Sequence, residues 1–397
     1  MTRAEQTINA IRDVLLYILL FITAISYHPV IINASRIAGY ESGTILSRYI
    51  ILLFGVVFIL SLSVNFIKKS RLSRVYIIWL TIIFAVALFI QAFFRNRDMV
   101  RELRAFAIVF GAIMIGYDLK IEKRQRVFMI LVFCITVLFS GVMQVIMNNG
   151  GFVIANQYLT DAKNSLGAML ATSCFLSVYL FLTLSRRLSK SLAIALFLAS
   201  FLVMVTIRAR MAMVALLVVG LYYYFLTTKN RGLILTILIG VVVLCIGFLF
   251  LPSSVLNYIE ASFTAGTQGE DFTSGRMYTY LQAISYLLQN PLMGNVQKFN
   301  QIGWIHNYPL LKLYDYGLLF SWPILVLYVY ICIYTIKLSR HSQPLSTTCL
   351  GSTCLLIPYL ISMAEPTFPF GPGTVTLFNF ILLGMAEKEK LSQKGIR

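Results

Sequence analysis

The sequence predicts an all-α membrane protein that crosses the bilayer many times. Of its 397 residues, 59% are hydrophobic and only 12% are charged, about half the charged fraction of ordinary soluble domains. A soluble domain of this length would need a charged surface to cover its core, and a mean hydropathy of +0.82 leaves too little polarity for one. The composition therefore excludes a soluble enzyme, a disordered chain and a basic nucleic-acid-binding domain.

The chain contains about 12 stretches long and apolar enough to be candidate spans, since a helix of about 20 apolar residues crosses the bilayer core. In order they are residues 14–32, 49–67, 75–94, 105–117, 127–148, 165–185, 191–207, 211–228, 232–250, 317–336, 347–363 and 373–386. The first is expected to remain as an anchor, because it lacks a small-residue cleavage site and another span follows. With no internal repeat and no Pro-rich linker, residues 1–397 are expected to form a single membrane domain.

The basic residues are distributed unevenly between alternate loops. With a cytoplasmic N-terminus, the cytoplasmic segments hold 21 of the 33 basic residues and six of the 15 acidic ones, a net charge of +15. The outer segments hold 12 basic and nine acidic residues, a net charge of +3. Because Lys and Arg are enriched in short cytoplasmic loops of membrane proteins, we expect both termini in the cytoplasm.

One long outer loop, residues 251–316, separates the ninth and tenth candidate spans. Loops of this length are usually functional. Apolar residues spaced by four, three and four positions from Met277 to Leu288 predict an amphipathic helix. The segment Asn290-Pro-Leu-Met-Gly294 ends it with a proline and a glycine. We expect this helix to lie along the outer membrane surface.

Seven outer arginines break the charge pattern: Arg95, Arg97, Arg101 and Arg104, then Arg208 and Arg210 between the seventh and eighth spans, and Arg276 in the long loop. A charge at a membrane-facing helix end is costly unless it meets a partner or water. An anionic ligand is one such partner, because Arg presents a planar fork that matches phosphate oxygens. Snorkelling to the lipid headgroups is the alternative. Arg276 also opposes the dipole of the helix it starts, which favours a role toward a ligand.

His306 is the one histidine of the long loop. Beside Trp304 and Tyr308 it fits an interfacial aromatic belt, and it equally fits a general base, since the pKa of histidine lies near neutrality. No second His or Cys lies close in sequence, and Asp315 is the only nearby carboxylate. We therefore expect no metal and no cofactor here.

Four sequence motifs occur in a characteristic order along the chain. They are Lys163-Asn164-Ser-Leu-Gly167, Thr206-Ile-Arg-Ala-Arg210, Ser274-Gly-Arg276 followed by Asn290-Pro-Leu-Met-Gly294, and His306-Asn307 followed by Asp315-Tyr-Gly317. With the span pattern, these motifs resemble the O-antigen polymerase and O-antigen ligase superfamily of bacterial surface-polysaccharide enzymes. Two positions depart from the family: Asp315 stands where Glu is frequent, and Ala209 stands where Ser usually precedes the arginine.

The resemblance implies a multi-pass glycosyltransferase of the GT-C type in the bacterial inner membrane. Its donor would be an undecaprenyl-diphosphate-linked oligosaccharide at the outer face. Carried over, Arg210 and Arg276 would hold the diphosphate, His306 would assist the attacking hydroxyl, and Arg208, Asn307, Asn164, Lys163 and Asp315 would bind substrate. Membrane lipid is an expected partner, a chain-length regulator is a candidate partner, and nucleic acid is not expected.

Within this superfamily two reactions fit the sequence. A polymerase moves the growing glycan onto the next lipid-linked repeat unit of an O-antigen or capsular polysaccharide, whereas a ligase moves the finished glycan to lipid A–core or another acceptor. The interval of 30 residues from Arg276 to His306 is shorter than in many ligases, which favours the polymerase. A flippase for the lipid-linked unit is a weaker alternative, because it predicts charges near the membrane midplane and repeated halves.

Overall fold

The computed structural model of the chain describes residues 3–38, 45–62, 64–119, 122–147, 163–227, 276–371 and 375–393. Within these ranges the ordered elements are helices, and no strand occurs, so the predicted all-α class is confirmed. Seven of the described helices are long and apolar enough to cross a membrane. They are α1 (Arg3–Ile25), α5 (Arg71–Phe94), α7 (Lys123–Met147), α8 (Lys163–Thr183), α9 (Arg187–Thr206), α10 (Arg210–Thr227) and α14 (Tyr308–Arg340).

The remaining helices are shorter or more polar. They are α2 (Pro29–Ile37), α3 (Ser47–Leu60), α4 (Val64–Lys69), α6 (Asp98–Asp118), α13 (Arg276–Gln289), α15 (Thr347–Ile361) and α16 (Leu377–Gln393). Each candidate span overlaps a described helix except the ninth, residues 232–250, which lies outside the described residues. The first 25 residues of the long loop, 251–275, also lie outside them.

The first two candidate spans are each interrupted. The stretch 14–32 divides into α1 and α2, and the break falls just before Pro29, where proline disfavours a helical conformation of the preceding residue. The stretch 49–67 likewise divides into α3 and the short α4. The second candidate span is therefore only a 14-residue helix, whereas the first becomes the 23-residue α1 followed by the separate nine-residue α2.

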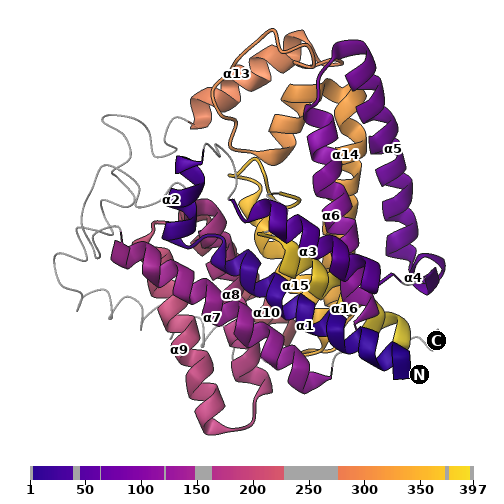
Figure 1. Cartoon of the computed structure of the whole chain (residues 1–397). Coiled ribbons are helices and arrows are strands. Elements are labelled where there is room, and N and C mark those ends of the chain that lie inside the picture. The colour runs from indigo at the N-terminus through magenta and orange to yellow at the C-terminus, as the bar shows by residue number, and fades with distance from the viewer. Residues whose placement is uncertain are drawn as a thin grey trace, which may run out of the picture.

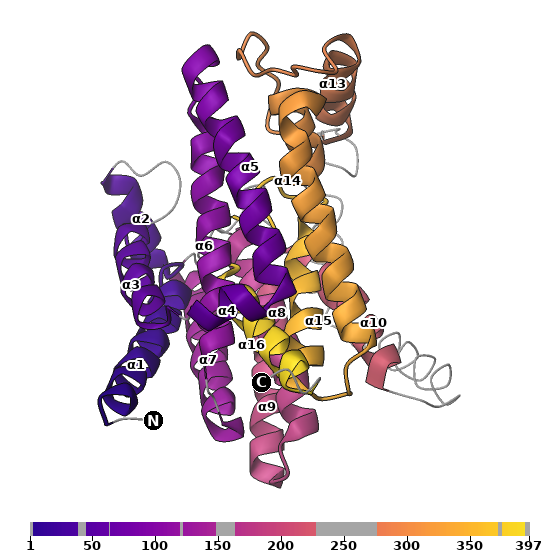
Figure 2. The same ribbon diagram turned by 90° about the vertical axis from the view of Figure 1, so that its right-hand side faces the viewer.

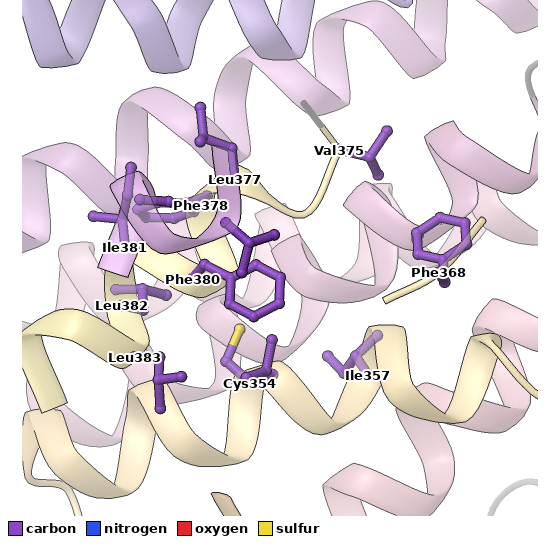
Figure 3. Close-up of a cluster of buried hydrophobic side chains, with 14 of the residues drawn as sticks. Cys354, Ile357, Phe368, Val375, Leu377, Phe378, Phe380, Ile381, Leu382 and Leu383 are labelled. Carbon is purple, nitrogen blue, oxygen red and sulfur yellow. The ribbon is translucent and has the colours of Figure 1, made fainter. Parts of the chain in front are cut away.

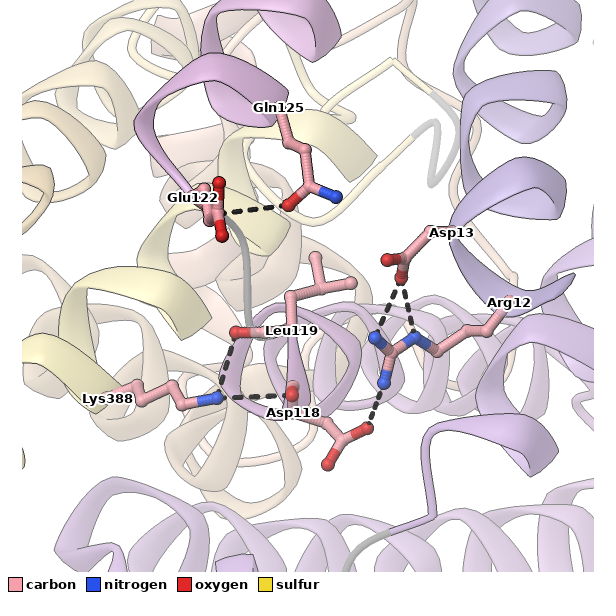
Figure 4. Close-up of polar contacts among 7 residues, drawn as sticks. All are labelled: Arg12, Asp13, Asp118, Leu119, Glu122, Gln125 and Lys388. Carbon is pink, nitrogen blue, oxygen red and sulfur yellow. Dashed lines mark hydrogen bonds and ion pairs between the residues drawn. The ribbon is translucent and has the colours of Figure 1, made fainter. Parts of the chain in front are cut away.

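At its other end, α1 extends further than predicted because its charges are paired. Arg12 is 1% exposed. It donates hydrogen bonds to Asp13 at 2.7 Å and to Asp118 of α6 at 2.5 Å (Figure 4). Lys388 of α16 donates to the backbone carbonyls of Asp118 and Leu119 in the same region (Figure 4). Burial of a charge is tolerated when it is paired and hydrogen-bonded, so this network ties α1, α6 and α16 together.

The core is densest around α8, α15 and α16. Almost every residue of α15 and most of α8 are buried, as expected of helices that are hydrophobic all round. Figure 3 shows side chains of this core from α15 and α16, with Cys354 and Ile357 facing Phe380 and its neighbours. α16 also packs closely on α6, and α8 on α9. These central helices form the rigid support for the loops between them.

The helix expected in the long loop is present as α13, at one end of the bundle (Figure 1). Both chain ends lie toward the opposite end in this view and in the view turned by 90° (Figure 2). The predicted apolar residues Met277, Leu281, Ile284 and Leu288 are 43–77% exposed. The opposite face of α13 packs through Ala283 against a small second core that includes residues 302–314. We refer to this end of the bundle as the α13 end.

Candidate active site

The two neighbouring arginines occupy a tight turn between α9 and α10. α9 ends at Thr206 and α10 begins at Arg210. Arg208 has a φ of +56°, a left-handed conformation that is rare for residues other than glycine and is found at functional sites. Its side chain is nevertheless buried, with the residue 7% exposed. The left-handed backbone of Arg208 and the burial of its guanidinium group indicate that this turn has a functional role besides connecting α9 to α10.

The first turn of α8 packs directly against this arginine turn. A Cβ atom built on Gly167 would lie 2.5 Å from the Cβ of Ala209, so only glycine permits the close approach. Lys163 and Asn164, at the start of α8, are therefore held beside Arg208 and Arg210. The charges of Arg208, Arg210 and Arg276 all act on the Lys163 ammonium, so the predicted motifs converge in space.

A buried carboxylate, Glu365, belongs to this cluster. It sits between α15 and α16, and its side chain is 8% exposed. Its Oε1 accepts a hydrogen bond from Nη2 of Arg276 at 3.2 Å. Its Oε2 lies 3.7 Å from Nδ1 of His306, a buried atom with no hydrogen-bond partner among the described residues. Glu365 also acts on Lys163. One carboxylate thus faces a histidine and several cations.

One helix-capping contact and two bonds to a neighbouring segment fix the backbone that directly follows His306. Asn307 is the N-cap of α14: its Oδ1 accepts from Leu310 N at 2.9 Å, as capping residues commonly do. Its Nδ2 donates to the carbonyl of Met363 at 3.1 Å, and Tyr308 N donates to the carbonyl of Ser362 at 2.9 Å. The predicted ligand Asn307 therefore has a structural role, which ties His306 to the segment that carries Glu365.

Tyr280 of α13 connects the same segment to the outer helix. Its hydroxyl donates to the backbone carbonyl of His306 at 2.5 Å. Burial raises the pKa of Tyr280, Arg276 opposes this increase, and Glu365 adds to it. The hydroxyl therefore stays protonated and able to donate. α13 thus supplies Arg276 directly and supports His306 through Tyr280.

Gly317 and Gly294 join α13 to α14 through the backbone. α14 is interrupted at Gly317, which has a φ of +59° and a ψ of −177°. The turn after α13 fills the gap: the N–H groups of Leu318 and Leu319 donate to the carbonyls of Pro291 and Leu292. A Cβ atom on Gly317 would lie 2.2 Å from the Leu292 carbonyl oxygen. The motif that ends at Gly294 and the motif that ends at Gly317 therefore pack directly against each other.

Asp315 lies apart from the cation cluster. The charges that act on it come from Lys312, Glu102, Asp98 and Lys298. Its position beside a separate pocket distinguishes it from the other predicted residues. Among the residues that the structure describes, no group of three or more His, Cys, Asp or Glu side chains could hold a metal ion.

Sequence reasoning missed Glu365. It is the only acidic residue between Asp315 and Glu387, and it follows an apolar span at the expected outer side. A lone acid at a span end is costly and usually functional, so this signal was available. What the sequence lacked was the contact that brings residue 365 to residues 276 and 306.

These observations define a multi-pass membrane protein with a buried cluster of cations, a histidine and one carboxylate beside the α13 end. Residues 194–317 match the family model described as O-antigen ligase (Wzy_C), which confirms the predicted resemblance over that range. The match begins within α9 and ends at Gly317. It includes the arginine turn, Arg276 and His306, but neither Lys163 nor Glu365. No curated protein matches the chain.

Proposed function

We propose that the protein is a polymerase of lipid-linked oligosaccharide repeat units, of O-antigen or capsular polysaccharide. It transfers glycan from undecaprenyl diphosphate to a sugar hydroxyl of the next unit. The observation that carries this proposal is the convergence of Arg208, Arg210, Arg276 and Glu365 on Lys163, together with the contacts of Glu365 to Arg276 and His306. A cationic cluster suits a diphosphate, and a histidine beside it suits a hydroxyl nucleophile.

The proposal includes a topology. The chain forms one membrane domain, residues 1–397, with about 12 spans of GT-C type in the bacterial inner membrane, and both termini are cytoplasmic. The placement of both chain ends opposite the α13 end supports this orientation (Figures 1 and 2), as does the net charge of +15 on the assigned cytoplasmic segments. The four exposed apolar residues of α13 support its lying on the outer membrane surface.

The arginines act on the leaving group. As the bond from the anomeric carbon to the diphosphate oxygen breaks, negative charge accumulates on the lipid diphosphate. Cations aimed at that developing charge stabilise the transition state. Arg210 and Arg276 form the clamp in this scheme, and Arg208 and Lys163 add to the local positive charge. Because the cations of the chain perform this role, the reaction proceeds without a metal cofactor.

His306 acts on the nucleophile. The acceptor hydroxyl oxygen attacks the anomeric carbon and forms the new glycosidic bond, and its proton passes to His306. Since Nδ1 faces Glu365, a proton on Nδ1 leaves Nε2 as the basic atom. The separation of 3.7 Å exceeds a hydrogen bond, and such contacts are often long before substrate binds. Glu365 is a positioning residue that orients the ring and holds Arg276.

A ligase is the second candidate, because the matched family model is described as O-antigen ligase. The two reactions share the donor and differ only in the acceptor. The short interval from Arg276 to His306, filled by α13 and its packed turn, supports the polymerase.

The product pattern separates the two reactions. Purified full-length protein in lipid nanodiscs, given only lipid-linked repeat units, is expected to produce a ladder of chain lengths on gels and in mass spectra. The ladder is expected to persist in excess EDTA. A ligase would give no product until lipid A–core or another acceptor was added. Loss of the ladder in EDTA with recovery in Mg²⁺ would contradict the metal-independent mechanism.

Glutamine in place of Glu365 is expected to lower the transfer rate. A hydrogen bond to a charged group contributes about 1.5–3 kcal/mol, which corresponds to a loss of about 10- to 100-fold. The exposed Glu122→Gln is the matched control and should retain the wild-type rate. The part of this loss that acts through His306 should be absent in a His306→Ala background, so the combined loss should be smaller than the product of the two single losses. Additive losses in the double variant would show that Glu365 acts independently of His306.

A further inference from the structure

A pocket of about 470 Å³ lies next to the cation cluster and has a different chemistry. Its walls come from the start of α6, the segment 302–316 and residues near the start of the Glu365 loop. Three carboxylates line it: Asp98, Glu102 and Asp315. Two cations, Arg101 and Lys312, also line it, and Glu102 is paired with Lys312. The pocket therefore lacks the excess positive charge of the arginine cluster, so a diphosphate is held less well here and a neutral ligand fits better.

Polar side chains inside this pocket are ordered by contacts among themselves. Lys312, with its side chain 4% exposed, donates to Glu102 Oε1 at 2.7 Å. Its ammonium also lies 5.0 Å from the centre of the Tyr308 ring. The Tyr308 hydroxyl is buried and has no hydrogen-bond partner among the described residues. The pocket thus offers both donors and acceptors, which a ligand rich in hydroxyl groups can satisfy.

Aromatic side chains supply the apolar part of the lining. Trp304 borders the pocket and is 68% exposed, although a large aromatic ring on a protein surface usually has something to contact. Tyr314 and Tyr316 lie on the same wall. Carbon-bound hydrogens on one face of a sugar ring pack well on such flat apolar surfaces, while its hydroxyls reach carboxylates. Apolar walls with a few placed polar groups are typical of small-ligand sites.

The pocket and the candidate active site share two chain segments. Ile305 and Tyr308 line the pocket, and His306, between them, faces Glu365. Pro366 and Thr367 line it as well, directly after Glu365. The base and its positioning residue therefore lie on the boundary between a cationic region and a carboxylate-lined, aromatic one.

We propose that this pocket binds a sugar residue of the acceptor glycan and presents its hydroxyl to His306. The proposal rests on the glycan transfer proposed above, and it assigns the acceptor to a place separate from the diphosphate. Trp304 is the platform for the sugar ring, and Asp315 accepts hydrogen bonds from its hydroxyls.

Binding measurements on the full-length protein in nanodiscs test this assignment. The probe is the lipid-free oligosaccharide released from the repeat unit by mild acid and labelled with a fluorophore. Trp304→Ala and Asp315→Asn are each expected to weaken its binding by about tenfold, the effect of losing roughly 1.4 kcal/mol of contact energy. Both should bind undecaprenyl diphosphate within twofold of wild type. Trp304 is mostly exposed, so its removal leaves the core intact.

Phe299→Ala is the matched control, because Phe299 is an 83% exposed aromatic residue of the same segment that does not line the pocket. It should leave both affinities unchanged. Unchanged oligosaccharide binding in Trp304→Ala and Asp315→Asn would overturn the assignment, as would a wild-type protein that binds no oligosaccharide. Failure of the proposed function would give a different result. The wild-type protein would then form no polymer, while Trp304→Ala and Asp315→Asn would still weaken oligosaccharide binding.

Discussion

Replacing His306 with alanine is expected to lower the rate of glycan transfer by about 10²–10⁴-fold, the usual contribution of a general base. The loss should appear in kcat, with KM for the lipid-linked donor nearly unchanged, because the proton moves only during the reaction. The measurement is polymer formation from lipid-linked repeat units in nanodiscs. The neighbouring contact between Arg276 and Glu365 does not involve the imidazole, so donor binding should persist.

His341→Ala provides the control for this substitution. His341 is an exposed histidine at the end of α14, on the expected cytoplasmic side. The variant should polymerise at the wild-type rate. If His306→Ala also forms polymer at the wild-type rate, then His306 is not the base and the aromatic-belt interpretation of this residue holds.

Replacing Arg276 with glutamine is expected to lower the transfer rate by about 10²–10³-fold, as removal of one donor from a charge-stabilising site commonly does. Arg276→Lys should recover only part of the activity, since an ammonium cannot reproduce the planar fork that binds two phosphate oxygens. The assay is the same polymerisation reaction, accompanied by equilibrium binding of undecaprenyl diphosphate. Both the rate and the affinity should fall.

The buried partner of Arg276 requires a check on folding. Loss of the guanidinium leaves Glu365 without its 3.2 Å partner, and a buried charge left unpaired destabilises a protein. Thermal unfolding of each variant separates this effect from catalysis. Arg210→Gln tests the same clamp without touching that ion pair, and Arg104→Gln, an exposed arginine of α6, is the control. Wild-type activity in both Arg276→Gln and Arg210→Gln would exclude the clamp.

The helices of this protein were largely predictable, because the bilayer imposes a length and an apolar composition on each span. The predicted helix bounds were least accurate where a buried ion pair or a proline, rather than the apolar composition, determines where a helix begins or ends. α1 includes Arg12 because Asp13 and Asp118 pair with it, and a partner 106 positions away cannot be read from local composition. The division at Pro29, in contrast, follows from a local rule, because proline disfavours a helical conformation of the residue before it.

The candidate site was predictable in part, for a similar reason. The arginines were identifiable because they lie on the outer side of the membrane, where few basic residues are expected. The order of the motifs along the chain linked these arginines to His306. Glu365 and the acceptor pocket were not predicted, since both depend on contacts between α6, α14 and the loop before α16. In the structure Asn307 caps a helix and Gly317 forms a backbone junction, contacts that the motifs alone do not indicate.

The backbone junction at Gly317 has a consequence for how substrates reach the site. Because the carbonyls of Pro291 and Leu292 fill the break in α14, residues 276–317 are held to the bundle as one unit rather than as a lid over it. The segment between Arg276 and His306 is thus attached to α14 by backbone hydrogen bonds as well as by the covalent chain. A site built in this way needs little reorganisation at the moment of reaction. In the proposed reaction the lipid carrier would then reach the site by diffusing within the membrane, and the acceptor sugar would approach from the water.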